Sequence, residues 1–337
     1  KKAVSVGIGL FIAFIGLLNA KIIIANPATK VALFSFKHAA ATGTFSSEGI
    51  GVLLAIFGIL FTALLMAKKV KGDILWGILF TWILGMLCET CGFYVPNPKV
   101  GMFSNFPNLS QGAASFLPAS LSPIFMQFDF SKFFSFDFLV VMFAFLFVDM
   151  FDTLGTLIGV ATKADMLDKD GHLPRIQGAL LSDAIATCAG AALGTSTTTT
   201  FVESAAGVAA GGRTGLASVF TAFLFGLSLF FSPIFLAIPA YATAPALVMV
   251  GFLMVTAISG IDFSDLSEAI PAYIAIIAMP FCYSISEGIC FGVISYVVLN
   301  TLLGKREKIS TLMYILAVMF ICKYIFLALV FLCGFFY

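Results

Sequence analysis

Charged residues are scarce in this chain. Lysine, arginine, aspartate and glutamate together make up 10% of its 337 residues, whereas a typical soluble domain has about 25%. Hydrophobic residues make up 61% of the chain, and the mean hydropathy is +1.09. This composition excludes an ordinary soluble globular domain and predicts an integral membrane protein.

Histidine is also scarce, which limits metal chemistry. The two histidines, His38 and His172, fall in distant loops. Cys88 and Cys91 form an isolated CxxC pair, whereas a structural zinc site takes about four ligands. The sequence has neither a Walker loop nor a nucleophile–base arrangement. We therefore expect no metal, and neither ATP hydrolysis nor an intramembrane hydrolase is supported.

The chain contains instead a succession of long apolar runs. A helix needs about 20 apolar residues to cross a bilayer, whereas a barrel strand shows alternation over about 10 residues. The runs therefore predict an all-helical polytopic protein with ten or eleven membrane segments, several of them short. The expected segments are residues 3–24, 47–67, 72–91, 137–161, 177–193, 195–211, 214–237, 243–258, 269–284, 286–303 and 309–336.

The distribution of positive charge favours one orientation in the membrane. If the N-terminal end and alternate loops lie in the cytoplasm, twelve lysines and arginines are inside and five are outside. This excess agrees with the tendency of cytoplasmic loops to carry positive charge. The orientation places the longest connection, residues 94–135, on the outer face.

Residues 194–207, GTSTTTTFVESAAG, interrupt the helical pattern. A run of β-branched threonines favours extended backbone, which is tolerated at membrane depth only where it is buried in protein or lines a cavity. We predict a half-crossing strand followed by a half-helix that starts near Phe201. The N-terminus of such a half-helix presents free N–H groups and partial positive charge, with Glu203 in its first turn.

Two aspartates stand in the middle of an apolar run. In FVDMFDTLGT, residues 147–156, Asp149 and Asp152 lie three residues apart and project from nearly the same helix face. Each costs at least about 2.5–3.5 kcal/mol at the bilayer centre, so a function or a partner is expected. Without a nearby intramembrane cation, at least one of Asp149, Asp152 and Glu203 should be protonated. Such a cluster can carry a proton or bind a donor-rich ligand.

Structural roles stay open for these acids. One of the paired aspartates could merely hydrogen-bond a neighbouring helix, and Glu203 could merely cap its half-helix. Asp183, in LLSDAIAT, lies near a span end, where a structural hydrogen bond is favoured. Lys323, in the last apolar run, is expected to snorkel or pack rather than to act as a ligand.

Three stretches of the sequence resemble a known family. They are FVDMFDTLGTLIGVA, LLSDAIATCAGAALGTSTTTTFVESAAGVAAGGRTGLASV and YATAPALVMVGFLM. They closely resemble the azaguanine-type branch of the nucleobase:cation symporter-2 family, the hypoxanthine/guanine/adenine permeases, and the similarity covers essentially the whole chain. The resemblance implies a uracil-permease-like fold of two inverted repeats of seven spans, with a core domain and a gate domain. In each repeat one core span is half strand and half helix.

The resemblance also implies roles for individual residues. The paired aspartates match acidic positions of the eighth span that are implicated in purine binding and transport. The glutamate matches the tenth-span acid that hydrogen-bonds the purine ring, and its neighbours line the strand–helix junction. The implied substrate-binding residues are Asp149, Asp152, Glu203, Thr199, Thr200 and Val202, and the candidates for proton coupling are Asp149, Asp152 and Glu203.

The same resemblance divides the chain into segments. The family's first four spans have no counterpart here, so the chain is expected to be truncated at its N-terminus relative to the family. Residues 1–94 match gate-domain spans five to seven, 95–136 form an outer loop, 137–238 match core spans eight to eleven with the substrate site, 239–304 match gate spans twelve to fourteen, and 305–337 form a C-terminal hydrophobic segment.

The implied function is uptake of a purine base across the cytoplasmic membrane. The core domain would move against the gate domain, with a proton as the coupling ion and no other cofactor. The resemblance also implies a homodimer through the gate domain and no nucleic-acid partner. Alternatives are an anion transporter or a uracil or xanthine transporter of the same fold, and a non-transporting truncated paralogue. An anion transporter is disfavoured, because three acidic side chains around the site would repel an anionic substrate. An intramembrane enzyme using paired acids ranks last.

Overall fold

The chain folds mainly into helices joined by irregular connections. The computed structural model describes residues 2–108, 115–118, 120–131, 133–168 and 172–334. The chain divides into two units: unit 1 is Lys1–Phe11, Met126–Val202 and Met254–Tyr337, and unit 2 is Ile12–Phe125 and Glu203–Leu253. Each unit is described separately below.

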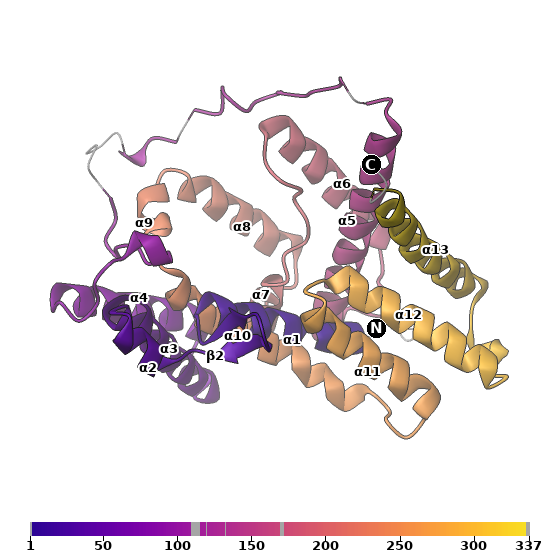
Figure 1. The fold of residues 1–337 in the computed structure, drawn as a ribbon, viewed down its shortest axis with the longest axis horizontal. Helices are drawn as coiled ribbons and strands as arrows, with labels where there is room; N and C mark the ends of the chain where they lie inside the picture. Colours follow the sequence, from indigo (N-terminus) through magenta and orange to yellow (C-terminus); the bar gives the residue numbers. More distant parts are fainter. Residues whose placement is uncertain (1, 109–114, 119, 132, 169–171, 335–337) are drawn as a thin grey trace. The chain divides into compact units, whose positions relative to one another are not determined.

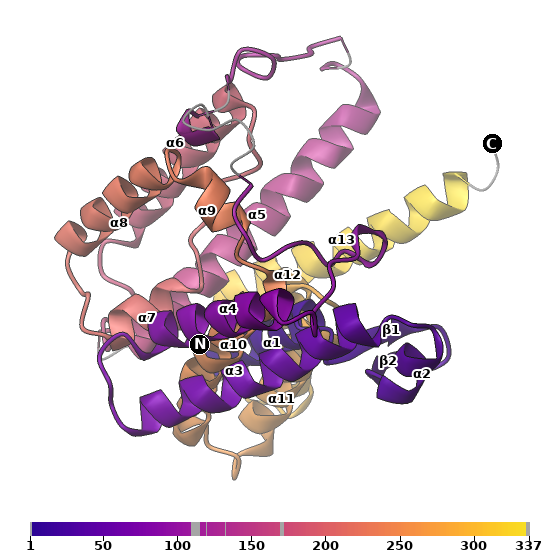
Figure 2. The same cartoon turned by 90° about the vertical axis from the view of Figure 1, so that its left-hand side faces the viewer.

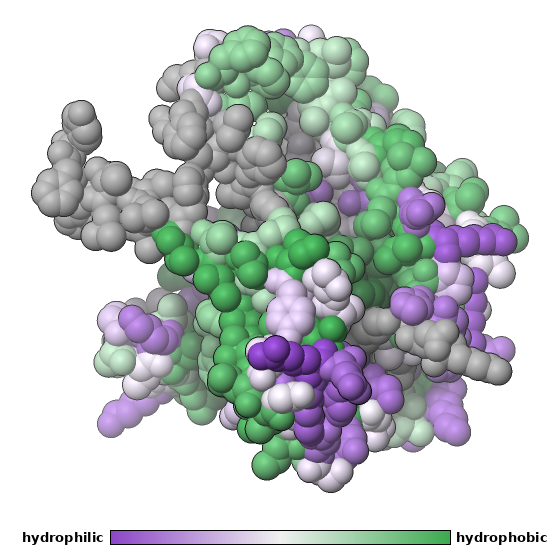
Figure 3. Space-filling model, turned by 90° about the vertical axis from the view of Figure 1, so that its right-hand side faces the viewer, coloured by the Kyte–Doolittle hydropathy of each residue, from purple (hydrophilic) through white to green (hydrophobic). Residues whose placement is uncertain are grey.

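Six helices of the described residues are long and apolar enough to cross a membrane. Figure 3 shows hydrophobic residues over much of one face of the molecule, with hydrophilic residues gathered in separate patches. Together these features confirm the predicted multi-pass, all-α fold class. The six helices are α1 (Lys2–Asn19), Phe45–Ala67 (the π turn η1, Phe45–Gly49, with α3, Ile50–Ala67), α4 (Asp73–Thr90), α6 (Ile176–Leu193), Ala240–Gly260 (α10, Ala240–Val255, with η4, Thr256–Gly260) and α12 (Ile285–Leu302).

The other helices complete the chain and correct one expected span. The run 214–237 is not continuous, because α8 ends at Ser228 and α9 begins at Ser232. Pro233 fits the first turn of a helix but lacks the N–H that a continuous helix would need. These helices are α2 (Phe36–Ala41), η2 (Pro98–Val100), α5 (Phe136–Lys163), α7 (Ser204–Ala209), α8 (Gly215–Ser228), α9 (Ser232–Leu236), α11 (Leu266–Phe281), η5 (Arg306–Lys308) and α13 (Thr311–Gly334).

The first apolar run is shorter than predicted, because α1 ends at Asn19 and a hairpin follows. Strands β1 (Ile23–Asn26) and β2 (Lys30–Leu33) pair antiparallel and lie next to α2 in Figure 2. Lys21 turns the chain with a φ of 56°. Its ammonium donates to Glu48 at 2.7 Å and to the Val100 carbonyl at 2.5 Å. The apolar run 22–24 therefore belongs to a hairpin and not to the helix.

In unit 1, α12 is the central helix, since it packs against α5, α11 and α13. Figure 1 shows α11 and α12 side by side, with α13 next to α12. Small residues allow the close approach of α11 and α12. A Cβ on Gly292 would lie 2.8 Å from the Ala275 Cβ, and one on Gly288 would lie 3.0 Å from the Ala275 carbonyl oxygen. Helices that lack a hydrophobic driving force in lipid commonly pack through such residues.

In unit 2, α3 and α4 pack through a reciprocal pair of glycines and threonines (Figure 2). Gly58 on α3 faces the Thr81 side chain on α4, and Gly77 on α4 faces the Thr62 side chain on α3. Both threonines are fully buried. Each satisfies its hydroxyl within its own helix: Thr62 donates to the Gly58 carbonyl at 2.7 Å and Thr81 to the Gly77 carbonyl at 2.8 Å.

A buried polar network ties the chain that follows α4 back onto unit 2. Asn105 is fully buried, and its side-chain and backbone N–H groups donate to Glu89 at 2.9 and 2.8 Å. Its side-chain oxygen accepts from the Tyr241 hydroxyl at 2.6 Å, and its carbonyl accepts from the Trp82 indole at 2.9 Å. Burial and the nearby Glu89 carboxylate raise the pKa of Tyr94 to about 12, so this phenol stays a donor. A fully satisfied network of this kind fixes a loop in one arrangement.

Unit 1 carries a charged cluster at the start of α11. Asp265 is the N-cap residue and accepts from the Ser267 hydroxyl at 2.7 Å. It also accepts from Lys305 at 3.2 Å and from Lys308 at 3.0 Å. The Ser267 hydroxyl and then the Lys308 ammonium hold the pKa of Asp265 well below its usual range. Hydrogen bonds to Asp265 and Glu268 in turn raise the pKa of Lys308.

The α3–α4 contact gives a first prediction. Gly77→Ala adds a Cβ against the Thr62 side chain, so the free energy of unfolding should fall by about 1–3 kcal/mol, the usual cost of overpacking. SDS titration of the protein in mixed micelles measures this change. The matched control is Gly226→Ala in α8, where a Cβ meets nothing within 4 Å. Equal effects of the two changes would refute the packing argument.

The charged cluster gives a second prediction. Because folding lowers the pKa of Asp265, its charge stabilises the folded state above the unfolded pKa of about 3.9 and loses this effect as pH falls through the folded value. Asp265→Asn, which can still cap α11, should therefore lower the unfolding temperature at neutral pH and weaken its fall on acidification. Thermal unfolding at several pH values tests this, with the exposed Glu307→Gln as control. An unchanged pH dependence in Asp265→Asn would contradict it.

Candidate functional site

The first aspartate of the apolar run reaches the interrupted segment. Asp149, on α5, is half-buried and accepts a hydrogen bond from the Thr197 hydroxyl at 2.7 Å. The Thr197 hydroxyl also lies 3.0 Å from the hydroxyl of Thr187 on α6. Hydrogen bonds to charged groups are shorter and stronger than neutral ones. This chain of contacts therefore joins α5, the interrupted segment and α6.

A second carboxylate reinforces the same junction. Asp183, on α6, accepts from the hydroxyl of Thr153 on α5 at 3.1 Å. It also accepts from the backbone N–H of Thr200 and interacts electrostatically with Asp149. The structural hydrogen bond expected for Asp183 is therefore confirmed. Residues 195–200 are thus held to both helices by carboxylates.

The break predicted in the 195–211 run is present, and it differs from the prediction in detail. Gly194 ends α6 with a φ of 77°, which glycine adopts without strain. Residues 195–203 are not helical, and they form no paired strand with the described parts of the chain. The half-helix begins at Ser204 rather than near Phe201 and has six residues. A β-strand needs a neighbouring strand to satisfy its backbone hydrogen-bonding groups. In this segment side chains satisfy some of these groups instead.

Gly190 makes room for the interrupted segment on α6. It is buried, and a Cβ at this position would lie 2.9 Å from the hydroxyl oxygens of Thr195 and Thr198. It would also lie 3.3 Å from the Ser196 carbonyl oxygen. The GxxxG spacing of residues 190–194 therefore serves a turn and a close approach of the chain to its own helix.

The second aspartate of the run faces a different helix. The backbone N–H of Ser286, at the start of α12, donates to the Asp152 carboxylate, and Asp149 and Lys323 act on it electrostatically. Its Oδ1 atom is buried and has no hydrogen-bond partner among the described residues. The paired aspartates therefore have different surroundings, and Asp152 keeps an acceptor without a donor.

The remaining predicted residues lie on either side of the boundary between the units. Thr199, Thr200 and Val202, in unit 1, are half-buried. Glu203 belongs to unit 2, is exposed, and occupies the N-cap position of α7 without a side-chain capping hydrogen bond. The capping role considered for it is therefore not observed. That Glu203 meets the aspartates around a substrate stays a prediction.

Several site contacts had no signal in the sequence. The donors Thr153, Thr187 and Ser286 are ordinary helix residues, and their partners come from other elements. Lys323 also differs from expectation, because it forms an ion pair with Glu287 at 2.5 Å instead of only snorkelling or packing. Lys323 also acts electrostatically on Asp152, so the expectation that no cation lies near the three predicted acids is wrong for Asp152.

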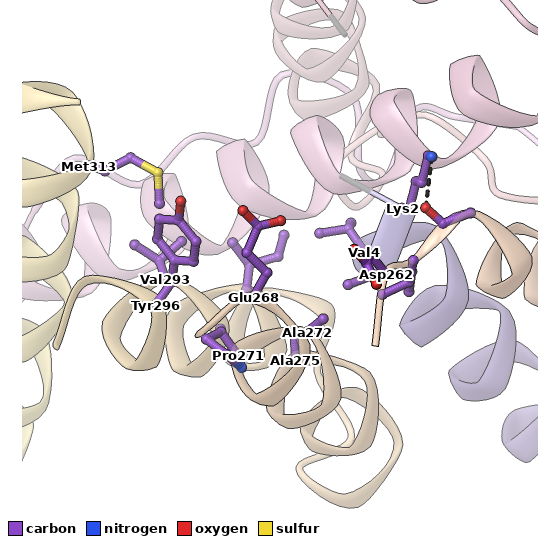
Figure 4. A pocket seen from close by; sticks show the side chains of 15 residues that line it. Lys2, Val4, Asp262, Glu268, Pro271, Ala272, Ala275, Val293, Tyr296 and Met313 are labelled. Atoms are coloured by element: carbon purple, nitrogen blue, oxygen red, sulfur yellow. Dashed lines mark hydrogen bonds between the residues drawn. The ribbon is translucent and has the colours of Figure 1, made fainter. Parts of the chain in front are cut away.

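Unit 1 also holds a pocket away from this junction. It has a volume of about 600 Å³ and is lined by the start of α1 and by residues of α11, α12 and α13. Figure 4 shows Glu268 and Tyr296 on one side and Lys2 and Asp262 on the other. Lys2 donates to the Gly260 carbonyl at 2.8 Å. Asp149 and Asp152 do not line this pocket, so it is separate from the carboxylate junction.

Comparison with known proteins identifies the family. The sequence profile of the Permease family (Xan_ur_permease) matches residues 3–291. The chain belongs to this permease family. Similar proteins include a putative permease, MJ0326, of Methanocaldococcus jannaschii, 44% identical over 97% of this chain and 69% of the relative. The guanine/hypoxanthine permease PbuG of Bacillus subtilis is 41% identical over 97% and 68%, and the adenine permease AdeP of Escherichia coli is 36% identical over 95% and 66%.

Membership of the permease family settles the class of function. The resemblance read from the sequence motifs is confirmed at the level of the family, and the chain is a membrane transport protein of the cell membrane rather than an enzyme. In transport proteins, substrate sites are commonly formed by buried carboxylates and by a non-helical segment between apolar helices. The junction of α5, α6 and residues 195–200 is therefore the candidate site.

Gly190 gives a third prediction. Gly190→Ala should push residues 195–198 away from α6 and lower the free energy of unfolding by about 1–3 kcal/mol. The measurement is denaturant titration of the purified protein. Gly178→Ala is the matched control on the same helix, because a Cβ there meets nothing within 4 Å. A similar loss in the control would mean that α6 tolerates no added methyl group, and the close approach would then explain nothing.

Proposed function

We propose that this permease takes up a purine nucleobase, hypoxanthine, guanine or adenine, together with a proton. The observation that carries the proposal is the junction at which Asp149 and Asp183 hold a threonine-rich segment between α5 and α6. The relatives PbuG and AdeP, named as guanine/hypoxanthine and adenine permeases, support the choice of substrate class.

The chemistry of the substrate matches an acidic site. A purine base presents N–H donors along its edges, and a buried carboxylate accepts such donors with charge-assisted strength. We propose that Asp149, Asp152 and Glu203 accept these groups, and that Thr199, Thr200 and Val202 line the site beside the ring. The buried Oδ1 of Asp152 supports this role, because it has no donor among the described residues.

The coupling proton has an electrostatic reason. Several ionised carboxylates repel one another in a medium of low dielectric constant, so binding a proton reduces the cost of bringing them together. In the proposal one proton neutralises one carboxylate before the loaded core moves against the gate. This cycle needs no cofactor other than the proton. We also propose that the protein forms a homodimer through the gate domain.

Uptake by cells provides the fourth prediction. Radiolabelled hypoxanthine, guanine or adenine should accumulate in cells that lack purine transport but express the protein. Asp149→Asn or Glu203→Gln should lower uptake by about ten- to hundredfold, the usual effect of losing a hydrogen bond to a charged group. Asp129→Asn is the control, since Asp129 is exposed and bonds only locally to Ser131. Each variant must reach the membrane in equal amount.

Other outcomes select the alternatives. Uptake of uracil or xanthine without purine uptake would identify a different nucleobase transporter of the same fold. Uptake of an anion alone would overturn the role of the carboxylates, and no uptake of any solute would indicate a non-transporting paralogue. Purine uptake that ignores the pH gradient would remove the coupling proton but keep the substrate.

A further inference from the structure

A second group of polar residues joins α12 to α13. The Lys323 ammonium donates to Glu287 Oε1 at 2.5 Å, and the Tyr324 hydroxyl donates to Glu287 Oε2. The side chains of Lys323 and Glu287 are 21% and 25% exposed. Both helices are otherwise strongly apolar. An ion pair in such surroundings carries a desolvation cost, so it is expected to have a functional role or additional hydrogen-bond partners.

The start of α12 favours carboxylates. Ser284 is the N-cap residue and accepts from the Glu287 backbone N–H at 3.3 Å. Glu287 lies in the first turn, and Asp152 accepts from the backbone N–H of Ser286, the preceding residue. The N-terminus of a helix carries partial positive charge, so two carboxylates from two helices meet a favourable field there.

Packing holds this group beside the aspartates of α5. The rings of Phe151, on α5, and Phe320, on α13, meet edge to face with their centroids 4.8 Å apart. Both are buried together with Cys290 of α12. Phe151 precedes Asp152, and Phe320 lies one turn before Lys323. The contact of these rings therefore holds the part of α5 that carries Asp152 against the part of α13 that carries Lys323.

Asp152 belongs to a connected network of charged and titratable groups from α5, α6, α12 and α13. Asp149 acts from its own helix and is itself coupled to Asp183 of α6. Lys323 of α13 acts electrostatically on Asp152, and Lys323 in turn interacts with Glu287 and Cys290 of α12, while Tyr324 of α13 bonds to Glu287. Among these groups the ammonium of Lys323 is the sole cation in the described residues. One positive charge is thus shared by several acids.

We propose that Lys323 is a positioning residue for the proton at Asp152. Its ammonium, held against α12 by Glu287 and Tyr324, favours the ionised form of the Asp152 carboxylate, and the charge of Glu287 weakens this effect. The ion pair thereby sets the pH at which Asp152 binds and releases a proton. The inference rests on the proposed function, because a coupled proton must be released at the pH of the cell.

Infrared spectroscopy of the purified protein in lipid nanodiscs tests the proposal without a substrate. The carbonyl band of a protonated carboxyl that is lost in Asp152→Asn is followed from low to high pH. Lys323→Gln should move its midpoint up, and Glu287→Gln should move it down, each by about one pH unit, a tenfold change in proton affinity. Lys323→Arg, which keeps the charge, should restore the native midpoint.

The double variant Glu287→Gln, Lys323→Gln guards against misfolding. It leaves no unpaired charge, and its difference from Glu287→Gln isolates the effect of the Lys323 charge. This difference should be an upward movement of the midpoint. Shifts of the same sign in both single variants would overturn the proposal, as would the absence of an upward shift in the double variant relative to Glu287→Gln. The loss of an ion pair that only stabilises the structure would not shift the midpoint according to the sign of the removed charge.

Purine uptake measured in the same variants separates the two proposals. If the protein takes up purines, the pH at which uptake is half-maximal should follow the infrared midpoints. If the variants take up purines but their infrared midpoints do not shift, the role of Lys323 is overturned and the proposed purine transport is kept. Opposite midpoint shifts in a protein that takes up no purine would support the role of Lys323 in proton binding and remove the proposed substrate.

Discussion

The interior of a bilayer offers no water to a polar atom, and this constraint shapes the rest of the structure. Helices satisfy their own backbone, so a chain with so few charges folds into apolar helices. Where the backbone leaves the helix, at residues 195–203, side chains must satisfy it. Asp183 accepts from the Thr200 N–H, and Asp149 accepts from the Thr197 hydroxyl. The carboxylates that look costly in the sequence are thus part of what holds the break in place.

The two units meet the constraint in different ways. Unit 2 removes its polar groups from hydrocarbon by full pairing: Asn105 uses its donors and acceptors with Glu89, Tyr241 and Trp82. Among the described residues, unit 1 leaves three buried polar atoms without a partner, Ser5 Oγ, Asn300 Oδ1 and Asp152 Oδ1, and of these the Asp152 oxygen belongs to a carboxylate that can bind a proton. A closed network suits a part of the protein that keeps one arrangement, whereas an open acceptor suits a part that binds a proton or a ligand.

Small residues connect the helices to these polar groups. Gly190 lets the threonine segment lie on α6, and the glycines of α12 let α11 come close. In lipid, helices associate through close packing and polar contacts because no hydrophobic force drives them together. The same glycines therefore serve packing and also determine which polar groups can reach one another. The position of Lys323 depends on the packing of α13 against α12, which the ion pair with Glu287 reinforces.

The sequence by itself determined the elements whose physics is local. Composition predicted a multi-pass helical membrane protein, and β-branched threonines predicted the break in the 195–211 run, because each depends on residues adjacent in the chain. The role of the buried aspartates in transport stays a prediction. The hairpin after Asn19 was missed, since its apolar strand is indistinguishable from the end of a helix by hydropathy alone. Only the tertiary structure decided the partners. Thr197 for Asp149, Thr153 for Asp183, and Lys323 for Glu287 lie 48, 30 and 36 residues apart in the chain, and no local pattern encodes a contact that depends on how separate helices pack.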